Sequence, residues 1–201
     1  MARVEKLRRT LNQVLTRFNG DGGARLLVEK LLDYNAKSPQ GVLHTVIQLL
    51  VAVKLLEKGY RVEVEYKLPQ NLVCDIYAWK GTHTLIVEVE TGYTPPAYAT
   101  TPRSYLRARI ALKALKYYRY ADKLVLAVPE HYNPPIPHQL VEPPERRDVT
   151  RLEELINEVR KYNPNTKTTI NDALKARIHA LMIVDVDNCR IRIRKPKTPK
   201  P

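Results

Sequence analysis

Apolar residues recur every three or four positions along the first sixty residues, a spacing that predicts helices. We expect one helix over 3–18, a second from about 24 to 34, and a third that begins at Ser38-Pro39 and ends near Gly59. Ser38 is the expected N-cap of the third helix, and Pro39 suits its first position. This third helix is apolar nearly all round, which is typical of a helix that is mostly buried.

Beyond Gly59 the apolar positions alternate with polar ones, which indicates β-strands. Between two of these strands, Gly81 and Thr82 fit a two-residue turn that pairs Lys80 with His83. The predicted order is helix, three strands, helix and strand. The three strands are expected at 60–67, 71–79 and 83–90, the second helix at 103–120 and the last strand at 123–128.

The last third of the chain is predicted to hold a proline-rich loop, two helices and a hairpin. A capping box of Thr150 and Glu153 predicts a helix over 151–162, and a second helix is expected over 170–180. Strands at 181–186 and 189–194 form the hairpin. At 201 residues the chain has the size of one domain. We divide it into N-terminal helices (1–37), a core (38–128), a proline-rich loop (129–149), C-terminal helices with the hairpin (150–194) and a disordered basic tail (195–201).

The charge of the chain favours a polyanionic partner. Lys and Arg total 34 against 21 Asp and Glu, a formal net charge of +13. Nucleic acid is the commonest partner of this kind, and a merely basic surface is the alternative. Gln48 and Lys54 interrupt the most apolar run, so we expect no membrane span. The N-terminus has no hydrophobic signal segment, and Cys74 and Cys189 lack metal-ligand spacing, so we expect a cytoplasmic protein.

Three carboxylates fall on neighbouring predicted strands. The expected turn places Asp75 opposite Glu88, and Glu88 shares a face with Glu90 because side chains alternate with period two. Like charges this close repel each other unless a cation lies between them. A divalent metal such as Mg²⁺ or Mn²⁺ is the usual solution. Glu90 lies near the end of its strand, and simple exposure to solvent is an equal alternative for it.

This arrangement resembles the PD-(D/E)XK nuclease superfamily, which includes restriction enzymes and archaeal Holliday-junction resolvases. The resemblance covers roughly 40–128 and rests on the αβββαβ order, on Asp75 and on Glu88-Val89-Glu90. The segment from Leu55 to Val62 is similar to the helix-to-strand junction of resolvase-like members. The resemblance implies an α/β fold with a restriction-endonuclease-like αβββαβ core and a mixed central sheet. The extra N-terminal helices and the C-terminal helical and hairpin extension would be additions to that core.

The resemblance also implies a metal-dependent endonuclease that hydrolyses phosphodiester bonds of nucleic acid, with DNA as the expected substrate, in repair, recombination or defence. Asp75, Glu88 and the carbonyl of Val89 would hold Mg²⁺ or Mn²⁺. The family has an acidic residue on the first core helix where this chain has Gln48, with His44 one turn earlier. These two residues could support the metal site, or they could simply be polar core residues whose hydrogen bonds are satisfied.

The family lysine is replaced by Glu90, which offers no positive charge but could act as a general base or take part in metal binding. Lys113, on the helix after the acid-bearing strand, is our candidate for the missing cation. The alternative function is a nuclease-fold protein that binds nucleic acid without cleaving it. A protein-interaction scaffold explains the fold but not the charge, and relatives of this kind often form homodimers.

Basic residues are candidates for contacts with nucleic-acid phosphates. We place Arg109, Lys113, Lys116 and Tyr120 on one stripe of the helix at 103–120. A solvated helix face is the alternative there, and on the last strand the arginines could instead prevent edge-to-edge aggregation. The candidates for nucleic-acid binding are Arg103, Arg107, Arg109, Lys116, Arg190, Arg192 and Arg194.

Overall fold

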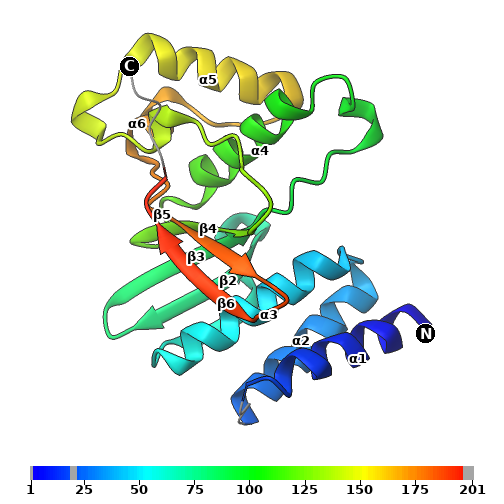
Figure 1. Ribbon diagram of the computed structural model, residues 1–201. Coiled ribbons are helices and arrows are strands. Elements are labelled where there is room, and N and C mark those ends of the chain that lie inside the picture. Colours follow the sequence, from blue (N-terminus) through cyan, green and yellow to red (C-terminus); the bar gives the residue numbers. More distant parts are fainter. Residues whose placement is uncertain (1, 19–21, 197–201) are drawn as a thin grey trace.

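The computed structural model describes residues 2–18 and 22–196, and it shows a mixed α/β protein (Figure 1). The described part contains these helices and strands: α1 (Ala2–Leu15), α2 (Gly22–Lys37), α3 (Val42–Glu57), β1 (Arg61–Leu68), β2 (Leu72–Lys80), β3 (His83–Val89), α4 (Pro102–Tyr117), β4 (Lys123–Pro129), α5 (Val149–Tyr162), α6 (Ile170–Lys175), β5 (Ala180–Asp185) and β6 (Arg190–Arg194). The predicted order of helix, three strands, helix and strand is confirmed as α3, β1, β2, β3, α4 and β4. None of the described helices has the length and apolar character needed to cross a bilayer.

The six strands form one mixed sheet in the order β1-β2-β3-β4-β5-β6. The strands β1, β2 and β3 are antiparallel to one another, β4 runs parallel to β3, β5 runs parallel to β4, and β6 is antiparallel to β5. Lys80 pairs with His83, as the turn predicts. Gly81 adopts a φ of 60°, which glycine reaches at little cost.

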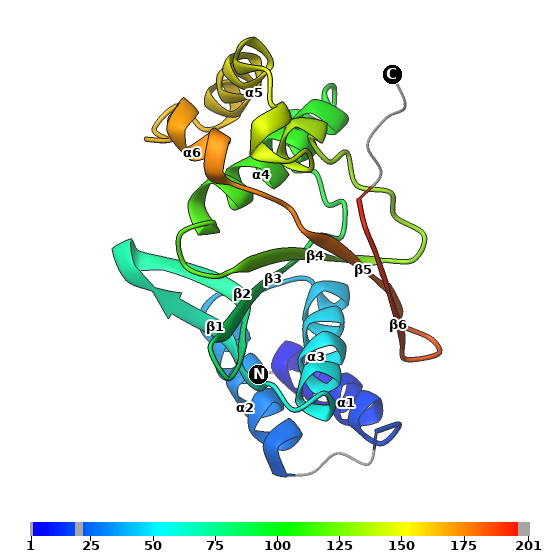
Figure 2. The same ribbon diagram turned by 90° about the vertical axis from the view of Figure 1, so that its left-hand side faces the viewer.

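The sheet separates two helical layers, α1–α3 on one face and α4–α6 on the other (Figure 2). Alternation along β3 explains this division: Leu85 and Val87 pack with the α1–α3 layer, and Ile86 packs with the α4–α6 layer. The helix α3 packs both on the sheet and on α1 and α2, so it needs apolar residues nearly all round. Val42 and Leu43 at its first turn are the exposed exceptions.

The alternation of β1 and β2 reverses halfway along both strands. Val64 packs in the α1–α3 layer, whereas Tyr66, two residues later, packs in the α4–α6 layer. Their partners on β2, Ile76 and Cys74, divide in the same way. The reversal falls at Glu65, whose φ of 49° lies in the left-handed region. Such a conformation costs a non-glycine residue roughly 1–2 kcal/mol, so the surrounding structure has to hold it.

Two helix starts differ from the predictions. The N-cap of α3 is Gly41 rather than Ser38, and no side chain caps it. The N-cap of α5 is Asp148, whose carboxylate accepts hydrogen bonds from the backbone N–H groups of Thr150 and Arg151, so the predicted capping box is wrong. In both helices the predicted start differs because a neighbouring residue with suitable backbone angles takes the cap position.

Two helix ends also differ. The helix α6 ends at Lys175 rather than near residue 180, because Ala176 leaves helical geometry and the chain becomes extended towards β5. The helix α4 ends at Tyr117, so Tyr120 does not belong to the helical stripe that we predicted. The predicted tail, 195–201, is described only at 195 and 196, and 197–201 lie outside the described residues.

Candidate active site

The backbone pairing of β2 with β3 stops at Ile76, next to Asp75. The ladder between them is complete from Lys80↔His83 to Ile76↔Val87, and beyond that point side chains take over. Glu88 Oε1 accepts a hydrogen bond from the Asp75 backbone N–H at 3.0 Å, and Asp75 Oδ2 accepts one from the Val89 N–H at 2.7 Å. The two carboxylates thus replace backbone carbonyls as acceptors, which fixes both side chains in the gap between the strands.

Lys113, from the middle of α4, places its ammonium among three carboxylates. Its Nζ lies 2.7 Å from Glu90 Oε1, 2.9 Å from Glu88 Oε2 and 3.9 Å from Asp75 Oδ2. The same ammonium donates a hydrogen bond to the carbonyl of Val89 at 3.3 Å. The ammonium therefore links β2 to the end of β3 through their oxygens.

Arg109, one turn earlier on α4, holds the other side of Glu90. Its guanidinium forms an ion pair with Glu90 Oε2 and donates to the carbonyl of Tyr93 at 2.9 Å. The Glu90 side chain is fully buried, so two cations satisfy a carboxylate that has no contact with water. Arg109 also fastens the segment after β3 to α4 through the Tyr93 carbonyl.

Burial and charge set the protonation of this cluster. Burial, followed by the charge of Asp75, raises the pKa of Glu88 to about 8, although Lys113 opposes the rise. Burial acts to raise the pKa of Asp75, but Lys113 and His44 outweigh it, so that this pKa is lowered. Burial acts to lower the pKa of Lys113, but the carboxylates raise it well above its usual value. A protonated Glu88 leaves two carboxylates against two cations, which is a neutral cluster.

On its other side, Asp75 faces α3. His44 Nε2 lies 3.4 Å from Asp75 Oδ1. Gln48 Nε2 donates to the Asp75 carbonyl at 2.6 Å and to Glu65 Oε1 at 2.8 Å. His44, Glu65 and Asp75 each present a ligand atom, and the three atoms lie within 4.8 Å of one another. These three residues have the chemistry to hold a divalent metal ion.

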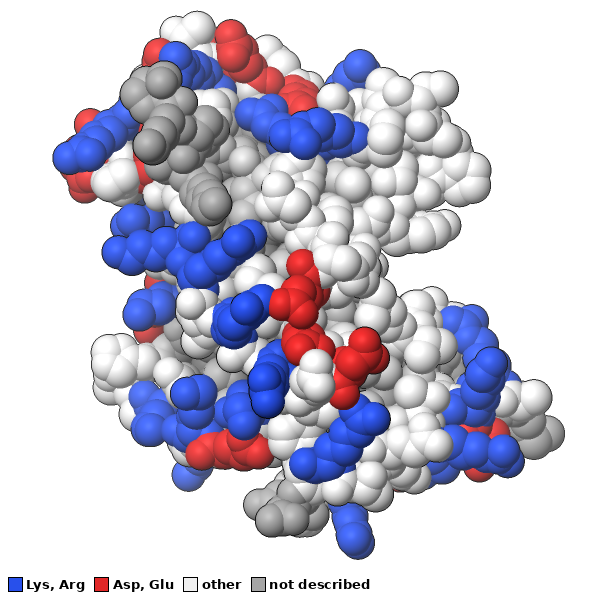
Figure 3. Space-filling model, in the orientation of Figure 1, with Lys and Arg blue, Asp and Glu red and all other residues white. Residues whose placement is uncertain are grey.

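A cleft leads from the surface to this cluster. It has a volume of about 640 Å³, and Figure 3 shows the molecule hollowed on its right-hand side between the part that contains α4 and the part formed by α1–α3. Its lining joins the chain before α3, the end of β3 and the inner face of α4. The lining residues are Arg3, Pro39, Gln40, Gly41, Val42, Leu43, His44, Val89, Glu90, Thr91, Tyr93, Arg109 and Lys113.

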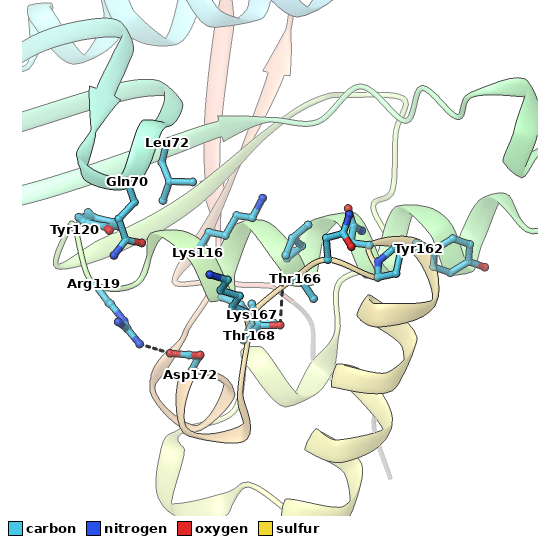
Figure 4. Close-up of a pocket in the computed structure, with 15 residues that line it drawn as sticks. Gln70, Leu72, Lys116, Arg119, Tyr120, Tyr162, Thr166, Lys167, Thr168 and Asp172 are labelled. Carbon is cyan, nitrogen blue, oxygen red and sulfur yellow. Dashed lines mark hydrogen bonds and ion pairs between the residues drawn. The ribbon is translucent and has the colours of Figure 1, made fainter.

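A second hollow, of about 780 Å³, lies on the other side of α4 (Figure 4). Lys116 lines it together with Lys167 of the loop after α5, and Arg119 at its edge forms an ion pair with Asp172. Asp75, Glu88 and Glu90 do not line this hollow. The structure thus separates Lys116 from Lys113, although they are only three residues apart.

The structure brings the predicted catalytic residues together and distributes the predicted nucleic-acid contacts. Asp75, Glu88 and Glu90 surround the ammonium of Lys113, and Gln48 donates to the Asp75 carbonyl. Within this group Val89, Glu90 and Lys113 line the cleft.

Among the basic residues, Arg107 is half-buried in an ion pair with Glu158, and Arg192 forms one with Glu130. Arg109 belongs to the cluster itself. The remaining candidates are exposed: Arg103, Lys116, Arg190 and Arg194.

Glu65 was not among the residues that the sequence suggested. Strict alternation along β1 places it on the same face as Glu63, which is partly exposed and forms an ion pair with Lys30. A signal was nevertheless present. A turn centred on Gln70 sets the register of β1 with β2, and the same register places Glu65 opposite Asp75.

The comparisons with known proteins give little further information. No family model matches the chain, and no curated protein matches it. Among solved structures, it is similar to the structure of SfsA from Pyrococcus furiosus in complex with Ca²⁺, with 13% sequence identity and a TM-score of 0.29. That similarity covers 77% of this chain and 60% of the other, so the chain spans about three fifths of that protein's length. This similarity is too slight to assign a family.

Proposed function

We propose that this protein is a metal-dependent nuclease that hydrolyses phosphodiester bonds of nucleic acid, with DNA as its main substrate. The observation that carries the proposal is the cluster of Asp75, Glu88 and Glu90 around the ammonium of Lys113 at the end of a cleft. Carboxylates that hold a metal, next to a cation that meets a phosphate, are the parts that phosphodiester hydrolysis requires.

Lys113 supplies the positive charge that Glu90 does not. As charge gathers on the scissile phosphate, an ammonium within reach stabilises the transition state more than the ground state. The Lys113 side chain is 22% exposed and lines the cleft, so a phosphate can reach it. Glu90 and Arg109 then act as positioning residues, because Glu90 binds both cations and keeps Lys113 directed at Asp75 and Glu88.

A divalent cation fits the site through Asp75. When it is bound, such an ion lowers the pKa of a coordinated water and neutralises phosphate charge. The ligand set of Asp75, Glu88 and the Val89 carbonyl remains a prediction. Lys113 contacts all three of these groups, so an ion placed on them and the ammonium compete for the same oxygens.

The charge of the chain supports nucleic acid as the substrate. Its net charge is +13, and exposed arginines and lysines lie on α4 and β6. Binding through phosphates releases counterions, so affinity for duplex DNA should fall with salt at a slope of about −0.9 per neutralised phosphate. A flat salt dependence would contradict this part of the proposal.

A second candidate function is nucleic-acid binding without cleavage. It is favoured by one observation: the ammonium of Lys113 already satisfies the carboxylates, so the cluster is neutral without a metal when Glu88 is protonated. A cluster of this kind can be a purely structural element of the fold.

Cleavage assays separate the two functions. Labelled duplex, single-stranded and branched DNA, and the matching RNA, are incubated with the protein and Mg²⁺ or Mn²⁺. The nuclease proposal expects cleavage that EDTA stops and that Asp75→Asn abolishes, whereas Asp33→Asn, an exposed aspartate on α2, behaves like wild type. Salt-sensitive binding without any cleavage would favour the second function.

A further inference from the structure

We infer that the metal ion of this site is held by His44, Glu65 and Asp75, and that this set of ligands prefers Mn²⁺ and related transition-metal ions to Mg²⁺. The inference names the cofactor of the proposed nuclease and rests on that proposal only for the use of the metal. It moves the ion from the β2–β3 side of Asp75, where the sequence resemblance places it, to the α3 side.

Three elements bring these ligands together. His44 comes from the first turn of α3, Glu65 from the middle of β1 and Asp75 from β2. Their ligand atoms lie within 4.8 Å of one another, and His44 Nε2 is 3.4 Å from Asp75 Oδ1. Metal–ligand bonds of about 2.1 Å place neighbouring ligands roughly 3–4 Å apart, so small side-chain rotations close the set around one ion.

The two oxygens of Asp75 face different partners. Oδ2 accepts the hydrogen bond of the Val89 N–H and lies towards Lys113. Oδ1 lies towards His44. One metal ion on Oδ1 and the ammonium near Oδ2 can therefore bind at the same time. This division removes the competition with Lys113 that affects the Asp75, Glu88 and Val89 set.

Two buried polar atoms beside the ligands are left unpaired by the described residues. Gln48 is fully buried, and its Oε1 has no hydrogen-bond partner among the described residues. The buried Nε2 of His44 likewise lacks a partner in hydrogen-bond geometry within the described chain. Leaving such atoms unpaired in the interior is unfavourable. A bound ion provides the partner that the His44 nitrogen needs.

The amides of Gln48 and Gln40 position Glu65. Both donate to Glu65 Oε1, at 2.8 and 3.0 Å, so the carboxylate is oriented before any ion arrives. They hold the carboxylate beside α3, at the residue where the backbone of β1 is left-handed. Supporting hydrogen bonds of this kind are usual around metal ligands and tune their affinity.

The chemistry of the ligands sets the preference for the ion. An imidazole nitrogen suits transition-metal ions such as Zn²⁺ and Fe²⁺ best, and Mn²⁺ accepts it more readily than Mg²⁺, which prefers an octahedron of oxygens with several waters. One histidine among three protein ligands therefore weakens Mg²⁺ relative to Mn²⁺. Replacing His44 should reduce this preference as well as the affinity.

Titration calorimetry of the full chain with MnCl₂ and MgCl₂ tests the ligand set. We expect Mn²⁺ to bind more tightly than Mg²⁺, and His44→Ala and Glu65→Gln each to weaken Mn²⁺ binding by at least about tenfold, the scale on which even supporting residues act. Glu63→Gln, two residues before Glu65 on the same strand, should bind like wild type, and Glu88→Gln should retain Mn²⁺ binding. Wild-type affinity in both His44→Ala and Glu65→Gln, or loss of binding in Glu88→Gln alone, overturns the inference.

A measurement on the unmodified protein covers the case in which a variant does not fold. Pulsed electron paramagnetic resonance of the Mn²⁺ complex of the untagged chain should detect coupling to an imidazole nitrogen, and its absence overturns the inference. The metal site and the nuclease activity can fail independently of each other. Mn²⁺ binding at these residues without any cleavage rejects the nuclease, whereas cleavage that survives both His44→Ala and Glu65→Gln rejects this metal site.

Discussion

Replacing Lys113 by methionine removes the one ammonium that the three carboxylates share, and it should destabilise the protein strongly. The side chains of Glu88 and Glu90 are 3% and 0% exposed, so water cannot replace the lost partner. Removing one member of a buried ion pair costs about 3–5 kcal/mol, because the other member stays buried and unpaired. Methionine fills a similar volume, so the loss measures charge rather than packing.

The deficit of Lys113→Met should grow with pH. Without the ammonium, the pKa values of the buried carboxylates rise further in the folded state than in the unfolded state. The folded protein then binds more protons than the unfolded chain, so its stability falls as the pH rises. Urea unfolding followed by circular dichroism at pH 5 and pH 8 measures both effects.

The matched control is Lys116→Met on the same helix, where the side chain is exposed. It should change the unfolding free energy by no more than about 0.5 kcal/mol. For a chain of this size, the loss in Lys113→Met corresponds to a fall in Tm of roughly 6–20 °C. Equal stability of the two variants, or a deficit that shrinks from pH 5 to pH 8, would refute the reasoning.

Three further predictions concern the scaffold. Gly92→Ala should destabilise the protein by at least about 1–2 kcal/mol, because φ is +80° there and a Cβ would lie 2.7 Å from the ring of Tyr132. Gly22→Ala has open space and should not destabilise, and thermal unfolding of both variants tests this. Asp148→Ala should cost about 1 kcal/mol through loss of the α5 cap, and a similar loss in Thr150→Ala would contradict the cap assignment. Burial lowers the pKa of His179, whose Nδ1 accepts a hydrogen bond from the Leu124 backbone N–H at 3.1 Å. The unfolded chain therefore binds more protons at this residue, and stability should fall as the pH drops below about 6.5. His179→Gln should flatten the profile of stability between pH 7 and 5.

The sequence was informative wherever the determinants are local. The turn at Gly81 fixed the pairing of Lys80 with His83 and, with it, the approach of Asp75 to Glu88. The placement of β5 beside β4 was not predicted, because parallel pairing across 129–179 depends on the packing of the segments between them rather than on a local turn.

The candidate site was predictable in part for a similar reason. Lys113 could be proposed because it lies midway along the helix that follows the acid-bearing strand. Glu65 could not be proposed from alternation alone, because its φ of 49° reverses the faces of β1 in the middle of the strand. A left-handed glutamate has no signature in a single sequence. The register of β1 with β2 places Glu65 opposite Asp75, but the direction of its side chain is seen only from the hydrogen bonds that Gln40 and Gln48 donate to it.

The most direct test of the proposed nuclease is the origin of the oxygen in its products. DNA is incubated with the protein and Mn²⁺ in ¹⁸O-labelled water, and the terminal phosphates of the fragments are analysed by mass spectrometry. Hydrolysis at this site predicts one ¹⁸O atom per new phosphate in a single turnover, with the reaction lost in Asp75→Asn and retained in Asp33→Asn. Intact DNA, or labelled fragments formed equally well by Asp75→Asn, would contradict the account.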